Sequence, residues 1–428
     1  MTSIGRFEGA LPALLENIAE PQTPDYFDDL FWQTAHTSQR SAWTIPERWL
    51  PMLQIARQPV VAQPPWRAIG LLVLLVGALA ASLILAGTQH KLPPLTGPAS
   101  NGLVAFSRDG DILTFDPRTN VATVVIGGST IDSDPIWSQD GTRLLFRRQA
   151  PDMAGADFVM IARANGSGVK QLTPEPMPGL ASYTLSPDGR AAAIIADVKG
   201  APALFVADSD GRSIKRLEIG SFPFGASFDP TGSRILFVGA QGVDWSYSGL
   251  YLIDVDGSNL TTLVQPALYA PMEGAARWSP DGSLIAYGRW EANQSRVQSR
   301  VHVIGADGTN DRPVGHLEGV WYEAVRGWSP DGRRISIERS TAPANSPGRA
   351  WEPVIVALDG ATPDLTVGFQ TKDAWNDEWS PDGTVIQVQP EDANGNGLQQ
   401  LLWNTTNGTS RSAPWTADSY PAWQRVAP

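Results

Sequence analysis

The chain has 428 residues, of which 18% are charged and 42% hydrophobic, and its formal net charge is −12. This composition excludes wholesale disorder, and an acidic chain without a basic run is not expected to bind nucleic acid. The absence of cysteine excludes disulfides, thiolate metal sites and cysteine nucleophiles. The length predicts two or three domains, or one large all-β domain.

Residues 1–67 are predicted to form a partly helical cytoplasmic segment. Apolar residues recur at helical spacing between Leu11 and Ile18, and Thr23 followed by Pro24 is typical of a helix start. The prolines that follow prevent long helices. Two interpretations stay open, namely a tether with transient helices and a docking segment for a cytoplasmic protein partner.

Residues 68–87 form a run of 20 uncharged residues in which only Ser82 is polar. At 1.5 Å per residue, a helix of this length matches a bilayer core of about 30 Å. A buried globular helix is the alternative, but such a helix normally keeps a polar face. The run therefore predicts a single transmembrane helix.

Flanking charges predict the orientation of this helix. Three arginines lie within 20 residues on its N-terminal side, whereas Lys91 alone lies that close on the other side. The positive-inside rule then places the N-terminus in the cytoplasm and the remaining chain outside the cell membrane. Residues 88–100 are rich in proline and are predicted to form a stalk.

A short turn motif recurs along the rest of the chain at intervals of 43 to 51 residues. Its copies are WSQDG at Trp137, LSPDG at Leu185, FDPTG at Phe228, WSPDG at Trp278, Trp328 and Trp379, and a truncated copy at Trp423. Each unit adds apolar strands and a second glycine turn, which gives four strands per unit. This period and strand content are typical of β-propeller blades.

The two ends of the repeat region are complementary. Residues 101–126 supply three strands of a further blade but no first strand, and residues 420–426 supply a first strand with nothing after it. Together they predict a shared closing blade, which would remove free sheet edges. The predicted fold is therefore an all-β, seven-bladed propeller with four-stranded blades over residues 101–428.

The WSPDG turn, the apolar strand after it and the DG-type second turn resemble those of the TolB-like, WD-repeat-like β-propeller families. The resemblance covers residues 101–428. The same repeat also occurs in the propellers of prolyl-oligopeptidase-like peptidases and of oligogalacturonate lyases. The resemblance therefore implies a fold and leaves the function open.

The repeated tryptophans and aspartates are predicted to be structural, as buried rings and turn acceptors. The alternative is a ring of ligand contacts. These residues are Trp137, Asp140, Asp188, Trp278, Asp281, Trp328, Asp331, Trp379, Asp382 and Trp423.

Catalytic and metal-binding patterns are scarce. Only His302 and His316 lie in the propeller region, and no nucleophile elbow, zinc helix or phosphate loop is present. Asp392, Asn394 and Asn396 have the spacing of a calcium loop, but its twelfth position is a tryptophan, so a polar loop is favoured. The sequence predicts no enzyme activity, no cofactor and no metal.

The predicted ligand-binding face carries the long loops. Tight turns share the other face of a propeller and are expected to be too short to build a pocket, whereas long loops on a rigid scaffold commonly carry recognition. Charged residues such as Glu323 and Arg326 accompany aromatic residues there. The candidate aromatic residues are Trp245, Tyr247, Tyr269, Trp290, Trp321, Tyr322, Trp351 and Trp375. The alternative is that each ring folds over its own loop.

The favoured function is a membrane-anchored extracytoplasmic propeller that acts as a non-enzymatic binding or scaffold module for a peptide, protein or glycan. An alternative is a transmembrane sensor, because a short helical cytoplasmic part, one span and an exported domain resemble the layout of membrane-bound anti-sigma factors. In that case residues 1–67 dock a cytoplasmic partner. A third possibility is an unusual enzyme such as a polysaccharide lyase.

The predicted topology can be tested with protease. Protease added to spheroplasts should digest the propeller and spare residues 1–67, because only the propeller lies outside the membrane. Immunoblots against tags at the two ends measure this. Protection of the C-terminal tag would refute the orientation, and recovery of the intact protein in the soluble fraction would refute the span.

Overall fold

The computed structural model of the protein describes residues 97–428, apart from residues 242–246, 269–275, 294–295, 316–319, 321, 341, 343–350, 367–377, 389–398 and 427–428. The described part contains no helix that is long and apolar enough to cross a membrane. The predicted cytoplasmic segment, transmembrane helix and most of the stalk lie outside the described residues, so they stay predictions.

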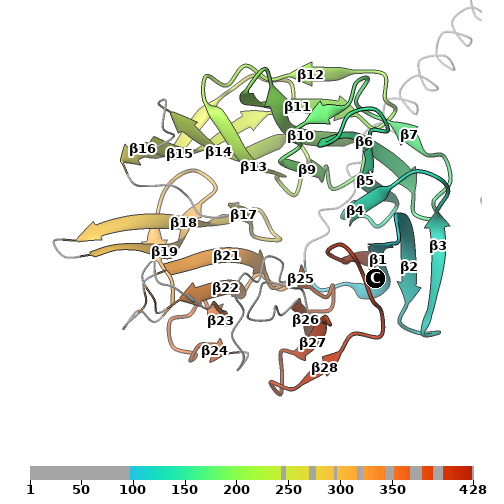
Figure 1. The fold of residues 1–428 in the computed structure, drawn as a ribbon. Coiled ribbons are helices and arrows are strands. Elements are labelled where there is room, and N and C mark those ends of the chain that lie inside the picture. Colours follow the sequence, from blue (N-terminus) through green and yellow to red (C-terminus); the bar gives the residue numbers. More distant parts are fainter. Residues whose placement is uncertain are drawn as a thin grey trace, which may run out of the picture. The chain divides into compact units, whose positions relative to one another are not determined.

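The described residues form seven antiparallel sheets that follow one another around a common axis (Figure 1). Blade 1 consists of β29 (Ala422–Val426), β1 (Ser100–Arg108), β2 (Asp111–Asp116) and β3 (Val121–Ile126). Blade 2 consists of β4 (Asp132–Trp137), β5 (Arg143–Gln149), β6 (Ala156–Arg163) and β7 (Lys170–Gln171), with β8 (Met177–Pro178) also paired to β6. Blade 3 consists of β9 (Ser182–Leu185), β10 (Ala191–Val198), β11 (Ala201–Asp208) and β12 (Ile214–Arg216).

The remaining four blades repeat this order. Blade 4 consists of β13 (Phe222–Phe228), β14 (Arg234–Gln241), β15 (Tyr247–Asp254) and β16 (Thr261–Leu268). Blade 5 consists of β17 (Arg277–Trp278), β18 (Leu284–Asn293), β19 (Arg296–Gly305) and β20 (Arg312–Pro313). Blade 6 consists of β21 (Tyr322–Trp328), β22 (Arg334–Ser340), β23 (Glu352–Ala357) and β24 (Leu365–Thr366). Blade 7 consists of β25 (Glu378–Trp379), β26 (Val385–Val388), β27 (Leu401–Asn404) and β28 (Ser410–Ser412).

The seven four-stranded blades and the shared closing blade confirm the fold predicted from the repeat. In blade 1, β29 pairs with β1 in a register that places Val104 opposite Trp423 and Ala105 opposite Ala422. The first strand of this blade therefore comes from the C-terminal end of the chain and its other three strands come from the region after residue 99. Because the two ends share one sheet, this pairing joins the last blade to the first.

The turn motif forms a repeated hydrogen-bond unit, which blade 5 illustrates. The Ser279 hydroxyl donates to the Asp281 carboxylate (2.6 Å) and accepts from the Leu284 backbone N–H (2.9 Å). Gly282 has a φ of 72°, a conformation in which a side chain would be strained, and its N–H donates to the Ser279 carbonyl (2.9 Å). The turn thus satisfies its own polar groups and reverses the chain between the first and second strands.

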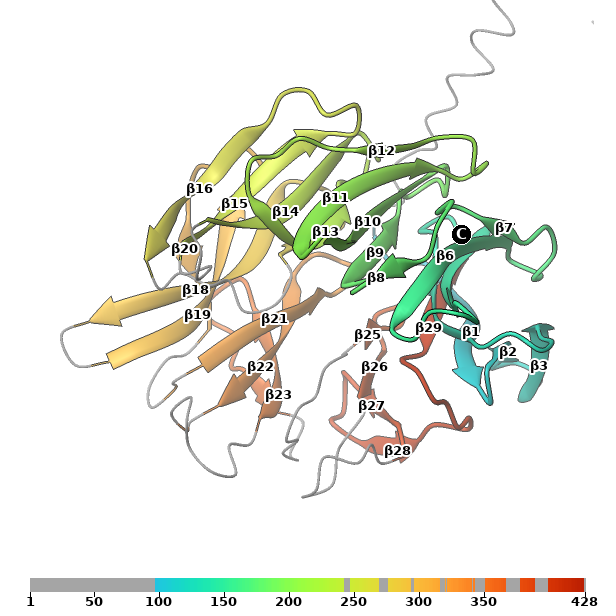
Figure 2. The same ribbon diagram turned by 45° about the horizontal axis from the view of Figure 1, so that its top comes forward.

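Neighbouring blades stack face to face (Figure 2), and each of the seven interfaces holds a cluster of buried apolar side chains. Some repeat tryptophans also bridge blades through their indole N–H groups. Trp328 donates to the Arg277 carbonyl in blade 5 (3.0 Å), and Trp137 donates to the Ala422 carbonyl in blade 1 (3.1 Å). Each of these rings therefore spans two blades.

The closing strand should stabilise the whole propeller. Deleting residues 420–428 removes β29 and Trp423, whose side chain is buried against Trp415 and β1, so unfolding should begin at a lower denaturant concentration throughout the propeller. Trp423→Ala alone should cost about 3–5 kcal/mol of unfolding free energy. Urea denaturation followed by tryptophan fluorescence measures both effects.

Val426→Ala serves as the control for these changes, because Val426 lies in the same strand and its side chain is 42% exposed. It should change the unfolding free energy by no more than about 0.5 kcal/mol. An unchanged urea midpoint in the deletion variant would contradict the role of β29 in closing the ring.

Candidate functional site

Part of the predicted ligand-binding face lies outside the described residues. This applies to Trp245, Tyr269, Trp321 and Trp375, and also to the calcium candidates Asp392, Asn394 and Asn396. Tyr247 is described, begins β15 and is 44% exposed. The face as a whole therefore stays a prediction.

Three of the predicted aromatic residues meet in an aromatic cluster, defined here as Trp290, Tyr322 and Trp351. The Tyr322 ring lies edge-on to both indoles, at centroid distances of 5.0 Å from Trp290 and 6.4 Å from Trp351. Tyr322 is only 4% exposed, and the buried indole nitrogen of Trp290 has no hydrogen-bond partner among the described residues. The cluster therefore packs blades 5 and 6 together and offers only part of its ring surface to a ligand.

Glu323, which the sequence suggested as a charged neighbour of these rings, is fully buried in the interface between blades 5 and 6. Its carboxylate accepts from Arg339 (2.9 Å) and from the Val301 backbone N–H (3.1 Å). Arg339 also donates to Asp364 (2.8 Å). These bonds satisfy the buried charges within the protein, so the network holds the two blades together.

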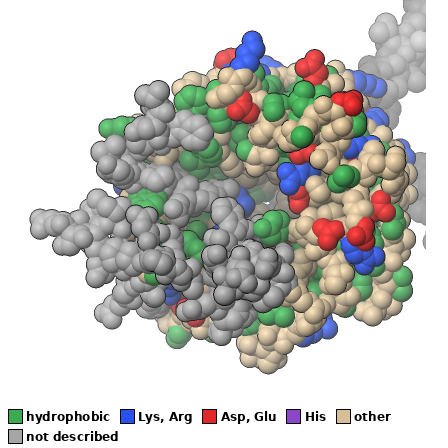
Figure 3. All heavy atoms as spheres, viewed as in Figure 1, with side chains coloured by type: hydrophobic (Ala, Val, Ile, Leu, Met, Phe, Trp, Pro, Cys, Tyr) green, Lys and Arg blue, Asp and Glu red, His purple; other side chains and the backbone are tan. Residues whose placement is uncertain are grey.

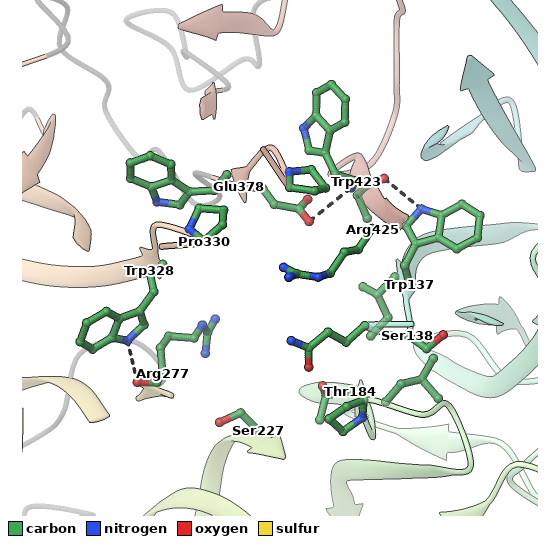
Figure 4. Close-up of a pocket in the computed structure, with 18 of the residues that line it drawn as sticks. Trp137, Ser138, Thr184, Ser227, Arg277, Trp328, Pro330, Glu378, Trp423 and Arg425 are labelled. Carbon is green, nitrogen blue, oxygen red and sulfur yellow. Dashed lines mark hydrogen bonds between the residues drawn. The ribbon is translucent and has the colours of Figure 1, made fainter. Parts of the chain in front are cut away.

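The structure contains a cavity of about 560 Å³, the axial cavity, at the tight-turn end of the propeller axis (Figure 4). All seven blades line it with the ends of their first strands and with the turns that follow. The residues directly before the repeat position illustrate this and are Ile136, Thr184, Ser227, Arg277, Gly327, Glu378 and Ala422. The expectation that the tight-turn face has no pocket is therefore wrong, because short turns from seven blades enclose a space together that none encloses alone.

Three arginines and one glutamate give the axial cavity its charge. Arg277, Arg326, Arg425 and Glu378 all line it, and in Figure 4 the guanidinium groups of Arg277 and Arg425 extend toward its middle. Arg326, expected among the long loops, instead forms an ion pair with the buried Glu338 carboxylate. The cavity is thus cationic, although the chain has a net charge of −12.

Desolvation acts on these groups in opposite directions. Burial lowers the pKa of Arg277 to about 10, helped by the positive charge of Arg326, and burial also lowers the pKa of Arg425. Burial raises the pKa of Glu378 to about 8, although the hydrogen bond from the Trp423 N–H (3.3 Å) opposes this. At neutral pH both arginines are charged, and Glu378 holds a proton more readily than an ordinary glutamate does.

Part of the outer surface carries charges of both signs. Figure 3 shows acidic and basic side chains interspersed over the half of one face that carries β1 to β12. The cations that line the axial cavity differ from this mixed pattern. The sequence carries a signal for the charged lining of this cavity. The tryptophan of the repeat recurs, but the residue before it differs in charge from one copy to the next.

His302, one of the two histidines in the propeller region, lies in a closed network in blade 5. Its Nδ1 lies 3.0 Å from the Asp311 carboxylate, which also accepts from the Tyr287 hydroxyl (2.8 Å). His302 is 5% exposed, and none of the three residues lines the axial cavity. Within the described part of the chain, no group of three or more His, Asp or Glu side chains is placed to hold a metal ion.

The comparisons with known proteins identify the fold. An oligogalacturonate lyase in complex with manganese is 18% identical, with a TM-score of 0.51 over 74% of this chain and 85% of that one. An oligogalacturonate lyase from Vibrio parahaemolyticus is 15% identical, with a TM-score of 0.50 over 74% and 86%. TolB from Acinetobacter baumannii is 15% identical, with a TM-score of 0.46 over 76% and 80%.

No family model and no curated protein matches the sequence. At these levels of identity, the similarity to the lyases shows the propeller fold alone. The function has to be argued from the site itself.

The raised pKa of Glu378 predicts a pH dependence of stability. Because the folded protein holds this proton up to about pH 8 and the unfolded chain releases it near 4.5, Glu378 stabilises the fold most at low pH. Its contribution is lost as the pH rises from about 4.5 through about 8. The unfolding free energy of Glu378→Gln should therefore fall less between pH 5 and pH 9 than that of the wild type.

Urea denaturation at pH 5, 7 and 9 measures this difference. Other titrating groups act on both proteins equally, so the comparison isolates Glu378. Glu218→Gln, an exposed position outside the axial cavity, is the matched control and should keep the wild-type pH profile. If Glu378→Gln also keeps that profile, the carboxyl group is not desolvated in the folded protein.

Proposed function

We propose that this chain is a non-enzymatic binding module whose ligand occupies the axial cavity of the propeller. The observation that carries this proposal is a cavity of about 560 Å³ with a cationic lining in an otherwise acidic protein. Its volume falls in the range of about 300–1,000 Å³ that is typical of small-molecule sites. All seven blades line the cavity, so the packing of the ring fixes the positions of the side chains that would contact a ligand.

The proposal includes the cellular setting. Residues 68–87 anchor the protein in the cell membrane, and the propeller faces outward, where it meets its ligand. The apolar run and the arginine bias beside it support this arrangement. A protein, peptide or glycan bound over the long loops remains a separate possibility, supported by the exposed ring of Tyr247.

A second candidate function, a transmembrane sensor, is supported by the lead-in segment, defined as residues 97–101. Arg425 of the axial cavity donates to the Gly97 carbonyl, and Ala99 N–H donates to the Pro381 carbonyl at the cavity rim (2.8 Å). Asn101 donates to Asp382 in the same turn (2.8 Å). The chain that leads from the predicted membrane helix therefore touches the residues that would hold the ligand.

Blocking the axial cavity tests the binding proposal. Thr184→Trp places an indole in the cavity and should abolish binding of any ligand that an array of small molecules, glycans and peptides reveals for the full-length protein. Thr123→Trp is the matched control, because Thr123 is exposed on the outer strand β3 and should leave binding unchanged.

The same array distinguishes the two faces of the propeller. Binding that survives Thr184→Trp but is lost in Trp375→Ala would place the ligand on the long-loop face and refute the cavity. Thermal unfolding of each variant shows that the fold is kept.

A further inference from the structure

We infer that the axial cavity binds a small organic carboxylate, which the guanidinium groups of Arg277 and Arg425 hold between them. This inference rests on the proposed function and names the chemical class of its ligand. Its starting observation is that these two cations extend into the cavity and that neither forms an ion pair within the described part of the chain.

The other buried arginines of the propeller show what these two lack. Arg326 is paired with Glu338, and Arg339 with Glu323 and Asp364. By contrast, among the described residues the guanidinium of Arg277 has a single long hydrogen bond, to the neighbouring Ala276 carbonyl (3.4 Å). That of Arg425 donates to the Gly97 carbonyl, and its Nε is buried without a partner.

Both arginines are half-buried, and removing a cation even partly from water without a counter-charge costs free energy. The chain has 44 acidic residues to 32 basic ones, yet none of the described carboxylates pairs with Arg277 or Arg425. The one carboxyl group in the cavity lining, Glu378, forms no ion pair with either arginine, and its pKa is raised. A bound anion would supply the missing charge.

The donors favour a carboxylate over other ligands. A guanidinium presents parallel N–H groups that match the two oxygens of a carboxylate, and such charge-assisted bonds are about twice as strong as neutral ones. Glu378, whose pKa is raised, offers a further O–H donor when it is protonated. A neutral sugar would need ring surfaces for stacking, but the indoles of Trp137 and Trp328 point away from the middle of the cavity (Figure 4).

The Gly97 carbonyl is a weaker acceptor than a carboxylate, because it carries no formal charge. A carboxylate ligand can therefore replace it as the partner of Arg425. The ligand and the Gly97 carbonyl would then compete for the Arg425 guanidinium.

Isothermal titration calorimetry at pH 6.5 on the full-length protein tests this inference, with succinate, citrate and benzoate as probes. Succinamide and benzamide are the uncharged counterparts, and sulfate represents anions in general. At least one carboxylate should bind, and its amide should not. Arg277→Gln and Arg425→Gln should each weaken that binding by tenfold or more, whereas Arg212→Gln, an arginine with an 83% exposed side chain, should leave it unchanged.

Arg277→Lys and Arg425→Lys keep the positive charge but lose the paired N–H donors of the guanidinium, so each should also weaken binding. These variants replace a glutamine variant that fails to fold. Three results would overturn the inference: no heat with any of the three carboxylates, equal affinity for an amide, or equal affinity for sulfate. If the array reveals a neutral ligand that Thr184→Trp abolishes, the proposed binding function stands and the carboxylate is refuted. If Thr184→Trp leaves the binding of every ligand unchanged, the proposed binding function and the carboxylate inference are both refuted.

Discussion

The packing of both faces of every blade against its neighbours is the interaction on which the rest of the propeller depends. A four-stranded sheet that is apolar on both sides cannot be stable alone in water. Here seven apolar clusters lie between the seven blades, and the cluster between blades 7 and 1 includes Trp423 and Phe106 from the two ends of the repeat region. The ring therefore closes only when β29 joins β1, and the closure gives every blade two partners.

Closure of the ring also creates the axial cavity. It brings together strand ends that lie 43 to 51 residues apart in the sequence, so side chains from distant repeats face one another. Arg277 comes from blade 5, Glu378 from blade 7 and Arg425 from blade 1. Their desolvation is unfavourable, and the buried apolar surface between blades offsets it. A rigid ring can thus hold cations in positions that a small or mobile domain would relax.

The sequence predicted the features that repeat and missed those that arise between repeats. The WSPDG turns and their spacing were sufficient to predict the seven blades, and the incomplete units at residues 101–126 and 420–426 predicted the closing blade. The axial cavity was missed because each tight turn was considered alone, whereas the cavity belongs to seven turns at once. The aromatic cluster shows the same limit, since Trp290 lies within β18, Tyr322 begins β21 and Trp351 directly precedes β23, and no local pattern shows that they touch.

Arg425 links the cavity to the lead-in segment, and this link has a thermodynamic consequence. If a ligand carboxylate takes the guanidinium from the Gly97 carbonyl, binding and the Gly97 contact oppose each other, and each weakens the other by the same factor. The bonds of Ala99 to Pro381 and of Asn101 to Asp382 do not involve Arg425, so they hold the rest of the segment at the rim. If binding broke the Gly97 contact, only the part of the lead-in segment before Ala99 would lose its hydrogen bond to the cavity. That part leads toward the predicted membrane helix. If the protein is the sensor proposed above, this shared contact is the place where ligand binding would act on the lead-in segment.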